Sequence, residues 1–89
     1  SNKTKEIKGN AISIEEFGEL YEDEICIVEG EIFSLESRDV KNDKVIMTIR
    51  ITDEKSSLTT KVFLDKNKKL EVAVGDFVKI SGKKQIDKF

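Results

Sequence analysis

The sequence predicts a small all-β domain in which a Greek-key barrel follows one short helix. Isoleucine and valine occur eleven and seven times, against five leucines and two alanines, and side chains branched at Cβ favour strands. From residue 25 onward, apolar and polar residues alternate with the period of two that strands show. Glycine, asparagine and aspartate interrupt this alternation at short intervals, as is typical of turns between strands.

The 89 residues suffice for one domain with a modest core. Residues 1–24 are expected to form a leading segment, of which residues 1–11 are a flexible lead-in. Ser13 and Glu16 have the spacing of a capping box. Apolar residues at helical spacing then predict a short helix over residues 14–22, with Phe17 and Tyr21 in the core. These apolar residues are Ile14, Phe17, Leu20 and Tyr21.

The first strand is predicted over residues 25–35. Gly30 lies in its middle and indicates a bulge or a sharp bend, which long strands use at the corners of small barrels. Cys26 is interpreted as a small, buried apolar residue. Asn42 and Asp43 then predict a hairpin turn.

Two further strands complete the predicted meander. The second covers residues 45–52 and the third residues 57–64, and both alternate clearly between apolar and polar residues. The turn between them spans residues 53–56. In it, Asp53 is interpreted as a turn residue that accepts backbone N–H bonds.

A polar connection over residues 65–69 follows, and it has room for one helical turn. Gly75 leads into a fourth strand over residues 77–82, where Phe77 is interpreted as a core residue. The tail over residues 83–89 has the composition to turn and begin another strand. This order of elements fits a barrel of the OB type, and a small SH3-like barrel is the alternative.

Composition and charge exclude several classes of protein. The net charge is −2, which argues against a strongly basic nucleic-acid binder. Residues 1–24 hold three lysines against seven acidic residues, so the remainder is mildly basic. No apolar run approaches a membrane span. With no histidine and a single cysteine, we expect no metal site, no cofactor and a cytoplasmic location.

The alternation of the second and third strands predicts which side chains face solvent. One set should face the core: Met47, Ile49, Ile51, Leu58 and Val62. The other set should face outward: Ile46, Thr48, Arg50, Thr59, Lys61 and Phe63. Cations attract phosphates and a flat ring offers a stacking surface for bases, so the outward set has the ingredients of a single-strand binding site. Taken singly, these cations also fit a solvated face, and the rings fit core or rim packing.

Other cations and one more ring could extend this site. Phe33 on the first strand would enlarge the stacking platform. Basic residues lie near the first hairpin, on the polar connection and at the end of the fourth strand. They are Arg38, Lys41, Lys44, Lys66, Lys68, Lys69, Lys83 and Lys84.

Several segments resemble the OB domain of the PolC-type replicative DNA polymerase III alpha subunit of low-GC Gram-positive-type bacteria. The resemblance covers residues 25–89 and rests mainly on the spacing from Gly30 to Phe63. The hairpin at Asn42–Lys44 and the acid at Glu54 depart from the family's pattern. The matching segments are Val28–Phe33, Glu36, Arg38, Ile51–Asp53, Ser57, Lys61, Phe63 and Val74–Gly82.

The resemblance implies a module that binds single-stranded DNA or the template strand within a larger polymerase. Polymerisation and 3′-5′ exonuclease chemistry would then lie in other domains, so this fragment is not expected to be an enzyme. It also implies that the last strand of the barrel is truncated or missing after Phe89. A barrel opened in this way exposes a backbone edge, which we expect the lead-in or a neighbouring copy to cover.

A second hypothesis needs no contact with DNA. The chain could be a docking module between domains of the same polymerase, with Phe33 and Phe63 covered by neighbouring domains. A continuous positive stripe over the second and third strands would favour DNA, whereas a face of mixed charge would favour docking. An enzyme is the least favoured reading, because the sequence contains no nucleophile–base pair or ligand cluster.

Overall fold

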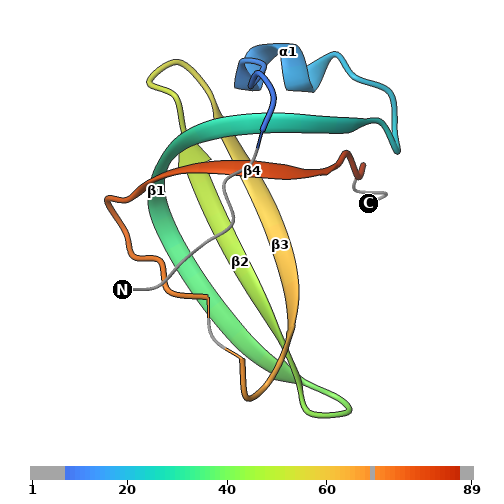
Figure 1. Cartoon of the computed structure of the whole chain (residues 1–89), viewed down its shortest axis with the longest axis vertical. Helices are drawn as coiled ribbons and strands as arrows, with labels where there is room; N and C mark the ends of the chain where they lie inside the picture. Colours follow the sequence, from blue (N-terminus) through green and yellow to red (C-terminus); the bar gives the residue numbers. More distant parts are fainter. Residues whose placement is uncertain (1–7, 69, 87–89) are drawn as a thin grey trace.

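The computed structural model describes residues 8–68 and 70–86. It contains one short helix and four strands (Figure 1). They are α1 (Ile14–Gly18), β1 (Ile25–Val40), β2 (Lys44–Thr52), β3 (Ser57–Asp65) and β4 (Phe77–Lys83). The four predicted strands are therefore confirmed, and β1 is five residues longer than the predicted 25–35.

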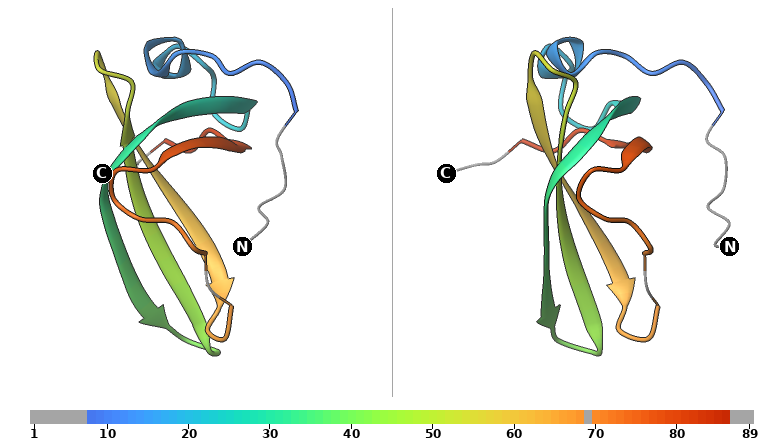
Figure 2. Two further views of the ribbon diagram at one scale, coloured as in Figure 1. Left: turned by 60° about the vertical axis from the view of Figure 1, so that its left-hand side comes forward. Right: turned by 90° about the vertical axis from the view of Figure 1, so that its left-hand side faces the viewer.

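The strands form one antiparallel sheet in the order β3-β2-β1-β4. Three consecutive strands form a meander, and the fourth returns to lie beside the first, which is the strand order of a Greek key. Strand β1 pairs with β4 through its first part and with β2 through its second part. It bends sharply between the two, so the sheet curls (Figures 1 and 2). The predicted small all-β, barrel-like fold is confirmed.

Two local features adapt β1 to this bend. At Gly30, an added Cβ would lie 2.6 Å from the backbone oxygen of Thr52, so only glycine lets the two strands approach so closely. The pairing register shifts between Ile32 and Ser34, which makes Phe33 the extra residue of a β-bulge. The glycine therefore marks the bend, whereas the bulge lies three residues further along the chain.

Both predicted hairpin turns are present. The first spans residues 41–43, and Asn42 and Asp43 in it have φ angles of 64° and 57°, in the left-handed region that asparagine and aspartate tolerate. In the second turn, the Asp53 carboxylate accepts N–H bonds from Lys55 and Ser56. Asp53 is therefore a turn residue, as predicted.

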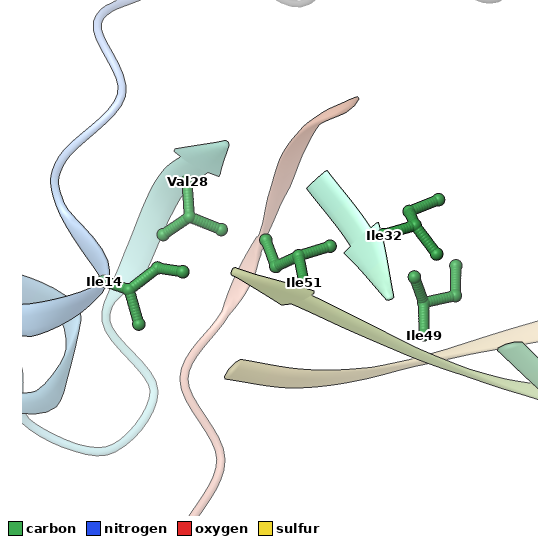
Figure 3. Close-up of a cluster of buried hydrophobic side chains, with 5 residues drawn as sticks. All are labelled: Ile14, Val28, Ile32, Ile49 and Ile51. Atoms are coloured by element: carbon green, nitrogen blue, oxygen red, sulfur yellow. The ribbon is translucent and has the colours of Figure 1, made fainter. Parts of the chain in front are cut away.

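The core gathers four strand residues and one residue of the helix, and the helix residue Ile14 lies next to Val28 (Figure 3). Ile49 and Ile51 are buried as predicted. Leu58 and Val62 pack against this cluster, whereas Met47 is only half-buried. Burying one such aliphatic side chain contributes about 1.5–3 kcal/mol. The buried cluster consists of Ile14, Val28, Ile32, Ile49 and Ile51.

Helix α1 begins as predicted and ends earlier than predicted. The capping box is formed, because the Ser13 hydroxyl accepts from Glu16 N–H and the Glu16 carboxylate accepts from Ser13 N–H. The helix ends at Gly18, a poor helix former, rather than at residue 22. Tyr21 consequently falls outside the helical face and is 81% exposed, so its assignment to the core was wrong.

Two other expectations about aromatic and sulfur side chains need correction. Phe77 is 68% exposed, because Val78 and Ile80 take the inward positions of β4 and the alternation turns Phe77 outward. Cys26 is half-buried rather than buried. Phe17 does pack against the core, as predicted.

The connection between β3 and β4 forms a turn at Lys66–Asn67 and contains no helical turn among its described residues. Leu70 and Val72 pack against the core from this connection. Residues 84–86 are not in a strand. The lead-in at residues 1–7, Lys69 and residues 87–89 lie outside the described residues. In the described part of the chain, no helix has the length and apolarity to cross a membrane.

Candidate nucleic-acid interface

The register of β2 and β3 brings the six outward residues together on one surface. Arg50 lies opposite Thr59, Thr48 opposite Lys61, and Ile46 opposite Phe63. Residues directly opposite each other in an antiparallel pair project from the same face. We call the surface formed by Ile46, Thr48, Arg50, Thr59, Lys61 and Phe63 the outer face.

Strand β1 continues this surface. Ser34, Glu36 and Arg38 lie opposite Arg50, Thr48 and Ile46. Arg38, which the sequence placed only near the first hairpin, therefore lies on the same surface as the outer face, and the Glu36 carboxylate lies beside it on the same strand. Glu36 was not considered as a member of the site, although its period-two spacing from Arg38 could have placed it there.

The β3 half of the outer face is open to solvent. Phe63 is 69% exposed, and Thr59 and Lys61 are exposed beside it. The β2 residues Thr48 and Arg50 are half-buried. Phe33, at the bulge next to Ser34, is 47% exposed. The Phe63 ring and the Lys61 ammonium group thus lie two residues apart on β3, and both are exposed to solvent.

Carboxylates partly neutralise the cations of this surface. The Arg50 Nη1 atom lies 3.6 Å from the Glu36 Oε2 atom, and Lys44 forms an ion pair with Asp65. The hydrogen bond from Lys44 lowers the pKa of the Asp65 carboxyl below its ordinary value. Arg38 and Lys61 have no carboxylate partner within the described ranges. The outer face therefore has mixed charge, with Lys61 and Arg38 as exposed cations.

A second surface runs along the edge of β3 that pairs with none of the described strands. A groove of about 820 Å³ separates this edge from β4. Apolar side chains from both strands, β1 and α1 line it, including Phe17, Val62 and Ile80. We call it the β3–β4 groove.

The β3–β4 groove accounts for a site residue that the outer face does not include. Lys83, at the end of β4, lies opposite Ile25 and is thus outside the three rows of the outer face. It lines the groove together with Thr59, Lys61 and Phe63. The groove therefore joins Lys83 to the β3 half of the predicted site.

Two other cations of the predicted site form contacts with groups of the chain itself. The Lys84 Nζ atom donates to the backbone oxygens of Phe17 and Gly18, both at 3.0 Å, and lies 4.9 Å from the centre of the Phe17 ring. It caps the end of α1, so Lys84 is not available for phosphate. Lys66 lies 3.5 Å from Asp39.

Asp53 links the helix to the sheet. One carboxylate oxygen accepts from Ile14 N–H at 3.2 Å, and the other accepts from Ser56 N–H at 3.0 Å. These bonds, that from Ile14 foremost, lower the pKa of the Asp53 carboxyl. Its oxygens are thus engaged by backbone donors, and no group of three potential metal ligands occurs among the described residues.

A scan against protein-family models finds no match for the chain. A curated protein named DNA polymerase III PolC-type, from Caldanaerobacter subterraneus subsp. tengcongensis, is 39% identical over 89 aligned residues. This chain is similar to one segment of a PolC-type DNA polymerase III. The match covers 96% of this chain and 6% of that relative. The resemblance to the polymerase is therefore confirmed, and the OB type of the domain stays a prediction.

Proposed function

We propose that this chain is an OB-type domain, over residues 25–89, that binds single-stranded DNA within a PolC-type replicative polymerase. The observation that carries the proposal is the juxtaposition of Lys61 and Phe63 on β3. Both are exposed, and the register places them beside Thr48 and Ile46 of β2. The similarity to a PolC-type polymerase segment supports a role in replication.

The proposed contacts divide between phosphates and bases. Phe63 offers its face to a base, and stacking of this kind contributes about 1–3 kcal/mol per base. Lys61 and Arg38 attract phosphates, and Thr48 and Thr59 supply hydroxyls for hydrogen bonds. Phe33 offers a second ring at the bend of β1. None of these contacts reads a base edge in a fixed orientation, so binding tolerates changes of sequence.

The charge pattern sets an upper limit on affinity. Arg50 and Lys44 each share their charge with a carboxylate on the same surface. If only Lys61 and Arg38 neutralise phosphates, the logarithm of the binding constant falls with the logarithm of salt concentration with a slope of about −1.4. We therefore expect weak binding that is measurable at low salt.

A titration of fluorescently labelled oligo-dT at low salt tests the proposal. The variants Lys61→Ala and Phe63→Ala should each weaken binding, and the double variant should abolish it. Phe77→Ala is the matched control for the ring, because Phe77 is 68% exposed against 69% for Phe63 and lies on β4. Lys55→Ala, in the exposed turn after β2, is the control for charge. Equal losses in the site and control variants would contradict the proposed site.

A docking role between polymerase domains is the second candidate. It is favoured by the mixed charge of the outer face and by the exposure of Phe33, Val74 and Phe77. On this hypothesis oligo-dT gives a flat titration at high micromolar protein. On either hypothesis the domain acts in the cytoplasm and is itself no enzyme, and the polymerase and 3′-5′ exonuclease chemistry belongs to other domains.

A further inference from the structure

Exposed apolar side chains gather where β4 begins beside the bend of β1 (Figure 1). Phe77, the first residue of β4, lies opposite Glu31 of β1. Glu31 and Phe33 are both exposed, on either side of the buried Ile32. Opposite residues of a strand pair project from the same face, so both rings leave the sheet on one side. Val74, in the turn before β4, is also exposed. We call Phe33, Val74 and Phe77 the β1–β4 patch.

Hydrogen bonds fix the backbone beneath the β1–β4 patch. Gly75 N–H donates to the Ile32 oxygen, and Ile32 N–H donates to the Asp76 oxygen, both at 2.8 Å. The Asp76 carboxylate also accepts from Ala73 N–H at 2.9 Å. The backbone that carries the patch is therefore ordered before a partner binds, which limits the entropy lost on binding.

The same pairing determines which form of partner fits. Below the patch β1 and β4 are hydrogen-bonded to each other, with Glu31 opposite Phe77 and Gly30 opposite Val78. A partner that lies on this face of the sheet therefore meets side chains. An extended peptide there would leave its own N–H and C=O groups without partners, whereas a helix pairs them internally. Helices are also the elements that commonly cover an apolar sheet face.

Carboxylates border the patch on the β1 side. Glu31 is exposed directly opposite Phe77, and Glu29 is exposed two residues before it. Neither carboxylate forms an ion pair with a described residue. The cation opposite Glu29 is Lys79, which donates to the Gly9 backbone oxygen at 2.9 Å. A complementary partner is therefore apolar in its centre and basic at the margin that faces Glu31.

The size of the patch indicates where the partner comes from. A fully covered aromatic side chain buries about 150–250 Å², so two rings and a valine fall short of the roughly 800 Å² per partner in a stable complex of separate proteins. Domains of one chain need less contact area, because their linker keeps the effective concentration high. The segment that matches this chain is 6% of the PolC-type relative, so most of such a polymerase is available to supply the partner.

We propose that the β1–β4 patch binds an amphipathic helix from another domain of the same polymerase, with apolar residues in its centre and lysine or arginine facing Glu31. The helix covers both rings and Val74. This inference gives the docking candidate a surface and a partner, and it shares with the proposed DNA binding only the assignment to a polymerase. Because DNA binding is assigned to Lys61 and Phe63 on β3, one domain can perform both roles.

An NMR titration of the isotope-labelled chain with a synthetic helix tests the proposal. The probe is an alanine-rich peptide of about 18 residues, long enough to form a helix. It has leucines in one stripe, at spacings of three and four residues, and arginines along one margin of the stripe. The amide signals of Val74, Gly75 and Phe77 should shift, and those of Lys61 and Phe63 should not.

Two ring variants separate this surface from the DNA site. Phe77→Ala should weaken peptide binding about tenfold and leave the oligo-dT titration unchanged. Phe63→Ala should weaken oligo-dT binding and leave peptide binding unchanged. Phe33 belongs to both surfaces and is therefore kept. Both replaced rings are exposed, so the variants should keep the fold, which circular dichroism can verify.

A charge exchange tests the role of Glu31. In Glu31→Lys, binding of the arginine-bordered peptide should be lost, and a matched peptide with glutamates in place of the arginines should bind instead. Glu19→Lys is the control, because Glu19 is exposed at the end of α1. It should leave the preference for the arginine-bordered peptide unchanged.

The absence of shifts at millimolar peptide, or equal binding of both peptides to the unmodified chain, would overturn the proposal. So would binding that a central proline in the peptide leaves unchanged, because proline breaks a helix. Shifts of the patch signals by oligo-dT would assign the patch to nucleic acid, and a dimer that Phe77→Ala dissociates would assign it to a second copy. A flat oligo-dT titration beside peptide binding at the patch would contradict the DNA proposal and support this one.

Discussion

At the scale of single residues, two positions control how closely parts of the chain approach each other. Gly30 lets β1 pass the backbone of Thr52, and Lys84 closes the end of α1. Neither role follows from residue type alone. Glycine in a strand usually indicates that the strand is irregular. A lysine side chain is usually exposed to solvent.

Replacing Gly30 by alanine should destabilise the domain. The added Cβ would lie 2.6 Å from a backbone oxygen, and a backbone atom cannot rotate away as a side chain can. Overpacking of this kind costs about 1–3 kcal/mol. Urea unfolding followed by circular dichroism measures the loss. Gly82→Ala is the control, since its Cβ would meet no atom within 4 Å, and an equal loss there would contradict the explanation.

Replacing Lys84 by methionine should also destabilise the domain. The substitution keeps the aliphatic contact and removes the two hydrogen bonds to the end of α1. Lys84 is buried, and loss of hydrogen bonds made by such a charged group costs about 1–3 kcal/mol. Thermal unfolding of Lys84→Met and of Lys83→Met gives the comparison. The neighbouring Lys83 is exposed, so Lys83→Met should unfold at a higher temperature than Lys84→Met. Equal unfolding temperatures would contradict the role given to Lys84.

At the scale of elements, Asp53 joins α1 to the turn between β2 and β3. Its carboxylate accepts N–H bonds from both elements. The helix has only five residues and would be unstable alone. Its position over the core therefore depends on this contact, on its capping box and on the burial of Ile14.

The Asp53 contact should make stability depend on pH in the acid range. The pKa of Asp53 is lowered in the folded state, so its contribution is present above the unfolded-state pKa of about 3.9 and is lost as the pH falls through the folded-state value. Urea unfolding at pH 7 and pH 3 should therefore show that Asp53→Asn is less stable at pH 7 and that the difference shrinks at pH 3. Glu54→Gln, in the same turn, is the control. A difference that stays constant with pH would refute this assignment.

At the scale of the whole molecule, the distribution of charge limits binding to polyanions. Net charge is −2, and carboxylates of β1 and β3 lie beside the cations of the outer face. The same carboxylates could favour a protein partner, because mixed charge suits a specific docking surface. Removing one of them distinguishes the two effects.

The variant Glu36→Gln should bind oligo-dT more tightly than the unmodified chain. It releases Arg50 from its ion pair and removes a repulsive charge from the outer face. Since exposed ion pairs contribute about 0.2–1 kcal/mol, we expect a gain of about 1.4- to fivefold. Fluorescence anisotropy at low salt measures it, with Glu54→Gln as the control outside the outer face. Unchanged affinity would show that Arg50 lies outside the DNA path.

The sequence-based predictions were correct where the interactions join residues close in sequence and wrong where they join distant segments. The strands, both hairpin turns and the capping box were predicted correctly, because alternation, turn residues and caps act over a few neighbours. The end of α1 and the exposure of Tyr21 and Phe77 were predicted wrongly. A helical or strand period indicates which residues share a face, but burial of that face depends on what packs against it.

The amino-acid sequence by itself determined the strands, their alternation and therefore which side chains of β2 and β3 share a surface. The tertiary structure alone decided what surrounds those side chains. It paired Arg50 with Glu36, committed Lys84 to the helix and opened a groove along β3. The physical reason is that period and turn chemistry are local, whereas the ion pair depends on the register of β1 against β2, and the cap and the groove depend on the bend of β1 at Gly30.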